Sequence, residues 1–189
     1  MKSIDGRPRA VLSTSTDAVR HCLWRVRLSG IAILVFSLST GSFANTLTGL
    51  VVGIADGDTF TLLDAAHVQH KIRLAGIDAP EKKQAFSNRS KHSLSSLIFG
   101  RQVSVEWNKV DRYGRVIGKV IIGDEDACLA QVRAGLAWHY KAYENEQSYV
   151  DRERYARAEL DARANKRGLW GEPTPLPPWE YRRARKRAH

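Results

Sequence analysis

Residues 50–78, LVVGIADGDTFTLLDAAHVQHKIRLAGID, contain three β-strand patterns in succession. The first pattern runs into Asp56-Gly57, a dipeptide that favours a tight hairpin turn. Residues 59–63 form the second pattern, and in residues 70–74 apolar and basic side chains alternate with a period of two. Because a strand sends alternate side chains to opposite faces, this stretch predicts three short strands that follow one another as a meander.

Two further strands and a helix are predicted after the meander. Apolar residues at helical spacing indicate a helix that ends at Gly100 and that Ser87 or Asn88 can cap. Residues 103–107 alternate as a fourth strand, and residues 116–122 form a fifth. Five short strands with a helix between the third and the fourth are typical of a partly open Greek-key barrel of the OB type.

The second half of the chain carries the start signals of two more helices. Asp126 can cap a short helix that is followed by Gly135, and Ser148-x-x-Asp151 opens a longer helix that is predicted to reach Lys166. The predicted fold class is therefore α+β, a five-stranded OB-type β-barrel with about three helices.

The N-terminal region has the parts of an export signal. Arg20, Arg25 and Arg27 precede an apolar run, residues 28–43, and small residues follow that suit cleavage after Ala44. The run is shorter than the roughly 20 residues that span a bilayer comfortably. We therefore expect residues 1–44 to be a signal peptide with a long polar extension, and the protein to be periplasmic or secreted. An uncleaved signal anchor in the inner membrane is the alternative, and a cleaved signal would engage the membrane only transiently.

Charge and composition divide the rest of the chain into two parts. The formal net charge is +10, and residues 179–189 hold five basic residues against Glu180. Residues 172–178 are rich in proline, which predicts an extended linker. We therefore expect a folded domain over residues 45–171, and a proline-rich linker and basic tail over residues 172–189. The basic balance favours a polyanionic partner such as nucleic acid.

Charged residues of chemical interest gather at the ends of the predicted strands. Asp58 opens the second strand and Asp78 follows the third, so a meander can bring the two carboxylates together as oxygen ligands for a hard cation. Glu81 lies within reach of the same point, and Arg73 projects opposite the apolar face of its strand. Taken singly, each has a plain structural explanation, since Asp58 suits a turn and Arg73 suits a solvated strand.

The arrangement as a whole resembles the thermonuclease, or staphylococcal nuclease-like, family. DGDT at residues 56–59, RLAGIDAPE at 73–81 and DRYGR at 111–115 match that family's motifs in type, order and approximate spacing. Related sequence recurs at GLA, residues 135–137, and GLW, residues 168–170. The resemblance covers residues 50–170, which is nearly the whole expected domain.

The resemblance implies a role for each matched residue. Asp58 and Asp78 would bind one Ca²⁺ through their carboxylates, and the backbone carbonyl of Ala79 would be a third ligand. The catalytic residues would be Arg73, Glu81 and Arg115, with Glu81 acting on the attacking water and the two arginines binding phosphate. Tyr113 would contact the nucleotide. Tyr140 lies where the aromatic spacing does not align clearly with the family, and it suits a nucleotide contact and a core aromatic position equally.

The function expected from the resemblance is hydrolysis of phosphodiester bonds in DNA and RNA with low sequence specificity, leaving 3′-phosphate ends. A monomer without a stable protein partner is expected. Two alternatives stay open on the residues alone. One is a non-catalytic OB-fold module that binds nucleic acid or protein, and the other is a membrane-surface protein in which the tail and anchor do the main work.

Overall fold

The computed structural model describes residues 45–188, so the expected signal segment 1–44 lies outside the described residues. Its largest sheet contains six strands in the order β3-β2-β1-β5-β6-β7. Neighbouring strands in this order are antiparallel. The six strands are β1 (Asn45–Ile54), β2 (Thr59–Leu63), β3 (Gln69–Leu74), β5 (Gln102–Val110), β6 (Val116–Ile122) and the short β7 (Glu125–Asp126).

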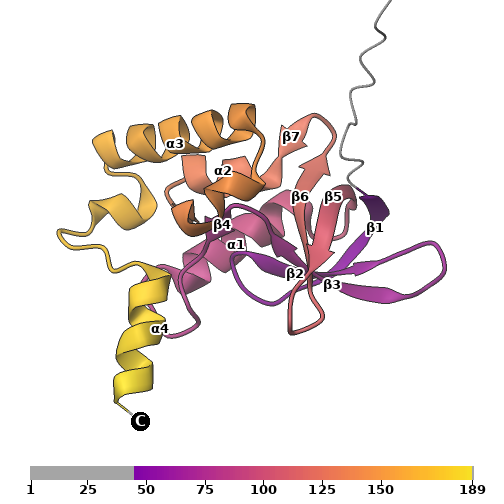
Figure 1. Ribbon diagram of the computed structural model, residues 1–189, viewed down its shortest axis with the longest axis horizontal. Coiled ribbons are helices and arrows are strands. Elements are labelled where there is room, and N and C mark those ends of the chain that lie inside the picture. The colour runs from indigo at the N-terminus through magenta and orange to yellow at the C-terminus, as the bar shows by residue number, and fades with distance from the viewer. Residues whose placement is uncertain (1–44, 189) are drawn as a thin grey trace, which may run out of the picture. The chain divides into compact units, whose positions relative to one another are not determined.

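A parallel pairing between β3 and β6 closes the first five of these strands into a barrel (Figure 1). Ile72 pairs with Val116 and Leu74 with Gly118 in this seam. On its other side Gly118 faces β5, where a Cβ atom would lie 2.4 Å from a methyl carbon of Val105, so glycine lets β5 and β6 pack closely at this point. The predicted five-stranded OB-type barrel is confirmed.

Apolar side chains at alternate positions along the strands fill the interior of the barrel. Ile72 and Leu74 are almost completely buried, whereas Lys71 before them is exposed and Arg73 between them is half-buried. Phe60 and Leu62 on β2 face the same core. Burying such a side chain contributes about 1.5–3 kcal/mol, so a one-residue slip in register would expose this whole set. The period-two pattern in the sequence therefore fixes which face of the meander is internal.

Three helices pack beside the barrel, as predicted: α1 (Ser87–Ile98), α2 (Ala127–Arg133) and α3 (Tyr149–Ala164). The side chain of Asp126 accepts a hydrogen bond from the Leu129 amide, and Ser148 accepts one from the Asp151 amide, so both predicted caps are confirmed. The predicted cap of α1 is wrong. Phe86 is the N-cap, with a φ of 64° and no side-chain cap bond, so neither Ser87 nor Asn88 has that role.

Several short elements carry no periodic signal and were not predicted. A two-stranded sheet joins β4 (Ile77–Asp78) to β8 (Trp138–His139), with Asp78 opposite Trp138. Two 3₁₀ helices, η1 (Lys141–Glu146) and η2 (Gly168–Gly171), flank α3 in the sequence. The β4–β8 pairing matters for function, because it fixes the backbone of Asp78.

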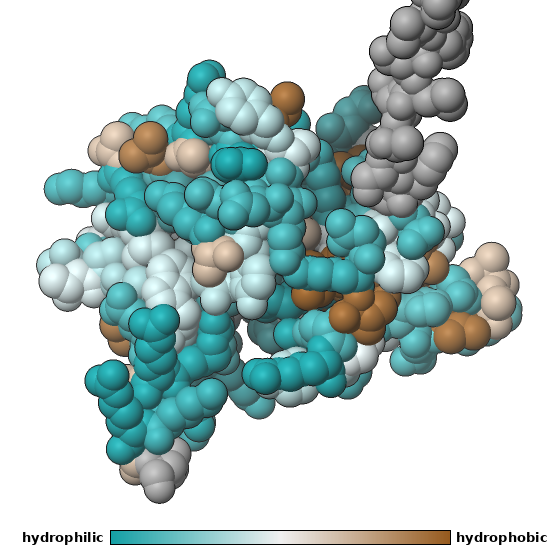
Figure 2. Space-filling model, viewed as in Figure 1, coloured by the Kyte–Doolittle hydropathy of each residue, from teal (hydrophilic) through white to brown (hydrophobic). Residues whose placement is uncertain are grey.

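The basic tail forms a fourth helix, α4 (Pro178–Arg187), within the described residues, where the sequence predicted about three helices in all. Pro178 occupies the first helical position, where its missing N–H costs nothing. The end of α4 that carries the C-terminus presents a strongly hydrophilic surface (Figures 1 and 2). No helix within residues 45–188 is long and apolar enough to cross a membrane.

Candidate active site

The turn between β1 and β2 is clamped against α1. Gln131 on α2 is 1% exposed, and its side-chain nitrogen donates to the carbonyl of Gly57 at 2.8 Å and to that of Ser90 at 3.0 Å. A Cβ atom at Gly57 would lie 1.8 Å from the Ser90 hydroxyl oxygen, so glycine allows this close approach. The clamp fixes the position of the next residue, Asp58.

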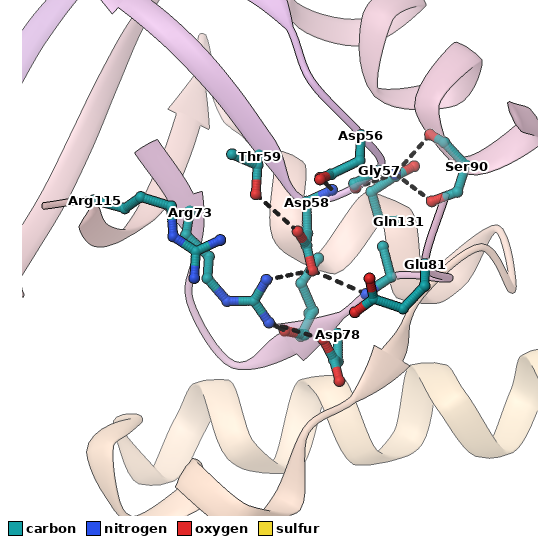
Figure 3. A network of polar contacts seen from close by, with 12 residues as sticks. Asp56, Gly57, Asp58, Thr59, Arg73, Asp78, Glu81, Ser90, Arg115 and Gln131 are labelled. Atoms are coloured by element: carbon teal, nitrogen blue, oxygen red, sulfur yellow. Dashed lines mark hydrogen bonds and ion pairs between the residues drawn. The ribbon is translucent and has the colours of Figure 1, made fainter. Parts of the chain in front are cut away.

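One arginine holds the two predicted metal-binding carboxylates together (Figure 3). Nη1 of Arg73 lies 2.7 Å from Oδ2 of Asp58, and Nη2 lies 2.8 Å from Oδ1 of Asp78. Asp58 and Asp78 are 4% and 1% exposed. The structure therefore brings together three of the residues that the sequence singled out, in a place where water solvates them poorly.

Ala79 lies directly beside this pair. Its amide donates to Oδ2 of Asp58 at 3.0 Å, and the residue is 5% exposed. The other carboxylate oxygen of Asp58 accepts a 3.0 Å hydrogen bond from the Thr59 hydroxyl. The backbone at Ala79, predicted to supply a carbonyl ligand, is thus anchored to the first carboxylate.

The pKa values reflect crowded negative charge. Burial raises the pKa of Asp78, and the hydrogen bonds from Arg182 and Arg73 offset only part of this. Burial also acts on Asp58, but attraction to Arg73 and the Ala79 amide lower its pKa overall. For Asp56, burial and the neighbouring charge of Asp58 raise the pKa to about 6. Such a cluster favours a further cation.

The side chain of Glu81 is held by a residue that was not among the predicted site residues. Nη1 of Arg182, on α4, lies 2.7 Å from Oε1 of Glu81, and Nη2 lies 2.8 Å from Oδ2 of Asp78. The same guanidinium also reaches Oδ1 of Asp78 at 3.2 Å. The side chain of Glu81 is 34% exposed, so it borders both the buried carboxylates and solvent.

Arg115 approaches from the loop between β5 and β6. Its guanidinium pairs with Asp111, with Nη2 2.7 Å from Oδ2, and in Figure 3 its side chain points towards Arg73. Asp111 also accepts hydrogen bonds from the amides of Tyr113 and Arg115, which fixes the loop. Tyr113 is 68% exposed, with the Arg115 guanidinium 5.5 Å from its ring centre. Arg115 thus lies near the carboxylate cluster without a hydrogen bond to it, and Tyr113 packs against Arg115.

Tyr140 directly follows β8 and packs against α4. Its ring stacks on Trp179, with ring centres 5.3 Å apart and planes inclined by 22°. A pocket of about 320 Å³ opens here, and aromatic and basic side chains share its wall: Trp138, Tyr140, Trp179, Arg163 and Arg183. Tyr140 is therefore a half-buried aromatic that faces a pocket.

The oxygen atoms present suit a hard cation. Carboxylates and carbonyls are the ligands that Ca²⁺ prefers, and two buried carboxylates beside the Ala79 peptide supply them. Within residues 45–188, no group of three or more His, Cys, Asp or Glu is arranged for a metal, so water or substrate would complete the coordination. The residues fit a weakly held divalent ion.

Comparison with known proteins agrees with the fold. The family model described as staphylococcal nuclease homologue matches residues 71–172. An uncharacterised endonuclease of Haemophilus influenzae is 36% identical over 154 residues, which cover 82% of this chain and 83% of the relative. A micrococcal nuclease of Shigella flexneri is 37% identical over 166 residues, which cover 83% and 92%. Helix α4 begins after the range that the family model matches.

Proposed function

Because the chain belongs to the staphylococcal nuclease family, we propose that it is a Ca²⁺-dependent nuclease that hydrolyses DNA and RNA with little sequence preference. Its expected products carry 3′-phosphate ends. The observation that carries the proposal is the convergence of Asp58 and Asp78 on Arg73, next to Glu81. Buried carboxylates, an arginine and a partly exposed carboxylate are the parts that phosphodiester hydrolysis needs.

In this proposal Asp58, Asp78 and the carbonyl of Ala79 hold Ca²⁺. The bound ion supplies positive charge that stabilises the phosphoryl group as it is attacked. Glu81 orients the attacking water and accepts its proton, a role that its contact with solvent permits. The burial of the two aspartates serves this chemistry, because charge interactions are stronger where water is excluded.

Arg73 and Arg115 are the proposed phosphate-binding residues. A guanidinium presents parallel N–H groups that match two phosphoryl oxygens, which an ammonium group cannot do. Asp58 and Asp78 orient Arg73, and Asp111 orients Arg115, so each guanidinium is held before substrate binds. Because both guanidinium groups are already oriented, less free energy is needed to position their charges during the reaction.

Two aromatic side chains, those of Tyr113 and Tyr140, provide surfaces for nucleobases. Tyr113 is largely exposed, and Tyr140 faces a pocket that Arg163 of α3 also lines. Stacking on such rings tolerates any base, which agrees with low sequence specificity. The exposed basic residues of α4 would attract the phosphate backbone. We further propose that the protein acts as an exported monomer, either periplasmic or secreted, unless its N-terminal segment stays in the inner membrane.

A plasmid-nicking assay tests this proposal. The purified protein should convert supercoiled plasmid to open circles in millimolar Ca²⁺ and should stop in excess chelator. Asp78→Ala should abolish cleavage, whereas Asp124→Ala, which removes an exposed aspartate from a turn, should keep it. Binding of DNA in a gel-shift assay without any Ca²⁺-dependent cleavage would instead identify a non-catalytic binding module.

A further inference from the structure

Helix α4 docks beside the candidate active site through its first turns. Trp179 stacks on Tyr140 and meets Trp138 edge-on, with ring centres 5.5 Å apart. Just before the helix, the carbonyl of Leu176 accepts a 2.6 Å hydrogen bond from the side chain of Gln84. Residues 183–188 are exposed, and Figure 1 shows this end of α4 directed away from the barrel.

The docked helix places Arg182 on the carboxylates that are proposed to bind metal and water. Its guanidinium donates to both carboxylate oxygens of Asp78, at 3.2 and 2.8 Å, and to Glu81 at 2.7 Å. The other arginine, Arg73, already occupies Oδ1 of Asp78 at 2.8 Å. Both carboxylate oxygens of Asp78 therefore accept hydrogen bonds from arginine. The bond to Oδ2 comes from Arg182 and so depends on the docking of α4.

A metal ion and Arg182 would compete for this position. Ca²⁺ lies about 2.3–2.6 Å from its oxygen ligands, which would bring it against a guanidinium bonded to the same carboxylate. Charge leads to the same conclusion. Arg73 balances part of the negative charge of Asp58, Asp78 and Glu81. Once Arg182 has left, the negative charge that remains suits a divalent ion. With Arg182 in place, part of that charge is already neutralised.

The same helix covers a proposed substrate surface. The indole of Trp179 lies nearly parallel to the ring of Tyr140, which is how a nucleobase stacks on an aromatic side chain. While α4 is docked, a base cannot take that face of Tyr140. Two positions that the reaction would use are thus filled by residues of α4, spaced one helical turn apart at Trp179 and Arg182.

We propose that α4 is an autoinhibitory segment, in which Arg182 takes the place of the metal ion and Trp179 takes the place of a base. The inference rests on the proposed function, since it concerns the same carboxylates. Loading of Ca²⁺ and substrate displaces the helix from its docking site. An isolated helix of 10 residues is marginal in water, so displacement also unfolds it.

Metal affinity tests the proposal without reference to activity. Ca²⁺ binding to the purified full-length protein is measured by displacement of luminescent Tb³⁺. If the docked state is about 90% populated, the apparent affinity is reduced about tenfold, so Arg182→Ala should lower the apparent Kd for Ca²⁺ about tenfold. Arg185→Ala removes the same charge from an exposed position of α4 and should change the Kd far less.

A second variant separates docking from charge. Trp179→Ala keeps Arg182 and the net charge but removes the stack on Tyr140, so it should also tighten Ca²⁺ binding. Hydrogen exchange adds a direct readout, because the amides of residues 179–187 should exchange faster in saturating Ca²⁺ than in chelator. Thermal unfolding of each variant checks that the barrel stays folded.

The outcomes distinguish this inference from the proposed function. If the wild type binds Ca²⁺ and neither Arg182→Ala nor Trp179→Ala tightens binding, α4 is no competitor and the inference is wrong while the nuclease site stands. If Arg185→Ala tightens Ca²⁺ binding as much as Arg182→Ala does, net charge explains the effect and the inference is wrong. If no variant binds Ca²⁺, the metal site and the inference fail together.

Discussion

Asp58 lies in the turn before β2 and Asp78 lies in β4, yet the two terminal nitrogens of the Arg73 guanidinium lie 2.7 and 2.8 Å from their carboxylates. The side chain of Arg73 is 16% exposed, and it stands opposite Thr59 in the β2–β3 ladder. The barrel thus sets the spacing of the two carboxylates, and the arginine keeps them close without metal.

Arg73→Lys should impair both stability and turnover. An ammonium group is a compact donor that cannot bridge two carboxylates in this fork geometry. A buried carboxylate left without its partner costs about 1–3 kcal/mol, so the unfolding free energy should fall by that order and kcat should fall as well. Arg101→Lys, at an exposed site, is the matched control. Chemical denaturation and nuclease kinetics on both variants make the comparison, and wild-type values for Arg73→Lys would count against the bridge.

Ca²⁺ should stabilise the fold through Asp78. A ligand at about 100 times its Kd stabilises the native state by about 2.7 kcal/mol, so saturating Ca²⁺ should raise the melting temperature. Asp78→Asn keeps the size of the side chain but removes its charge, and the Ca²⁺-induced shift should disappear. Asp124→Asn should retain the shift. An equal shift in all three proteins would place the bound ion elsewhere.

Gly57→Ala should destabilise the protein although the change is small. The new Cβ would lie 1.8 Å from the Ser90 hydroxyl oxygen and 2.9 Å from Cβ of Ala79. Crowding of this kind typically costs about 1–3 kcal/mol. Gly53→Ala in β1 meets neighbours at an ordinary 3.8 Å and should be tolerated. Denaturation midpoints measure the stability of both variants. If Gly57→Ala were as stable as Gly53→Ala, the turn would have to relax freely away from α1.

Asp151 should contribute stability that is lost in acid. Burial disfavours its charged form, but hydrogen bonds from Lys119 and Ser148 outweigh this and lower its pKa. A group with a lowered pKa in the folded state stabilises above its unfolded pKa of about 3.9, and this stabilisation disappears as pH falls through the folded pKa. Asp151→Asn should therefore lose stability at neutral pH and show a smaller drop below pH ~4. A parallel pH profile for variant and wild type would exclude this role.

The strands could be predicted from the sequence because their signals are local, and their order, with a helix after the third strand of the meander, indicated the barrel. The β3–β6 pairing that closes the barrel joins residues more than 40 positions apart and has no local signal. Alternation in residues 70–74 reports burial directly, and Asp126 and Ser148 have the short side chains that cap helices. The cap at Phe86 could not be predicted, since it uses backbone conformation and no side-chain bond.

Within the site, the sequence predicted the residues that belong to recognisable motifs. It did not predict the residues that reach the site only through tertiary packing. Gln131 reaches the β1–β2 turn from α2, and no local pattern separates it from any polar helix residue. Arg182 looked like one cation of a basic tail, and its contacts exist because α4 folds back onto the site. The raised pKa of Asp56 likewise comes from burial beside Asp58, although the sequence indicated a turn residue.

The central claim, catalysis by this carboxylate cluster, is tested most directly by kcat of Glu81→Gln in saturating Ca²⁺. The variant keeps the size of the side chain but removes its charge and basicity. General-base help is typically worth about 10²–10⁴ in rate, so kcat should fall by that order. The melting temperature should change little, and Ca²⁺ should bind at least as well, because Asp58 and Asp78 remain and Arg182 loses one of its two partners. A kcat equal to that of the wild type, with the metal bound and the fold intact, would contradict the account.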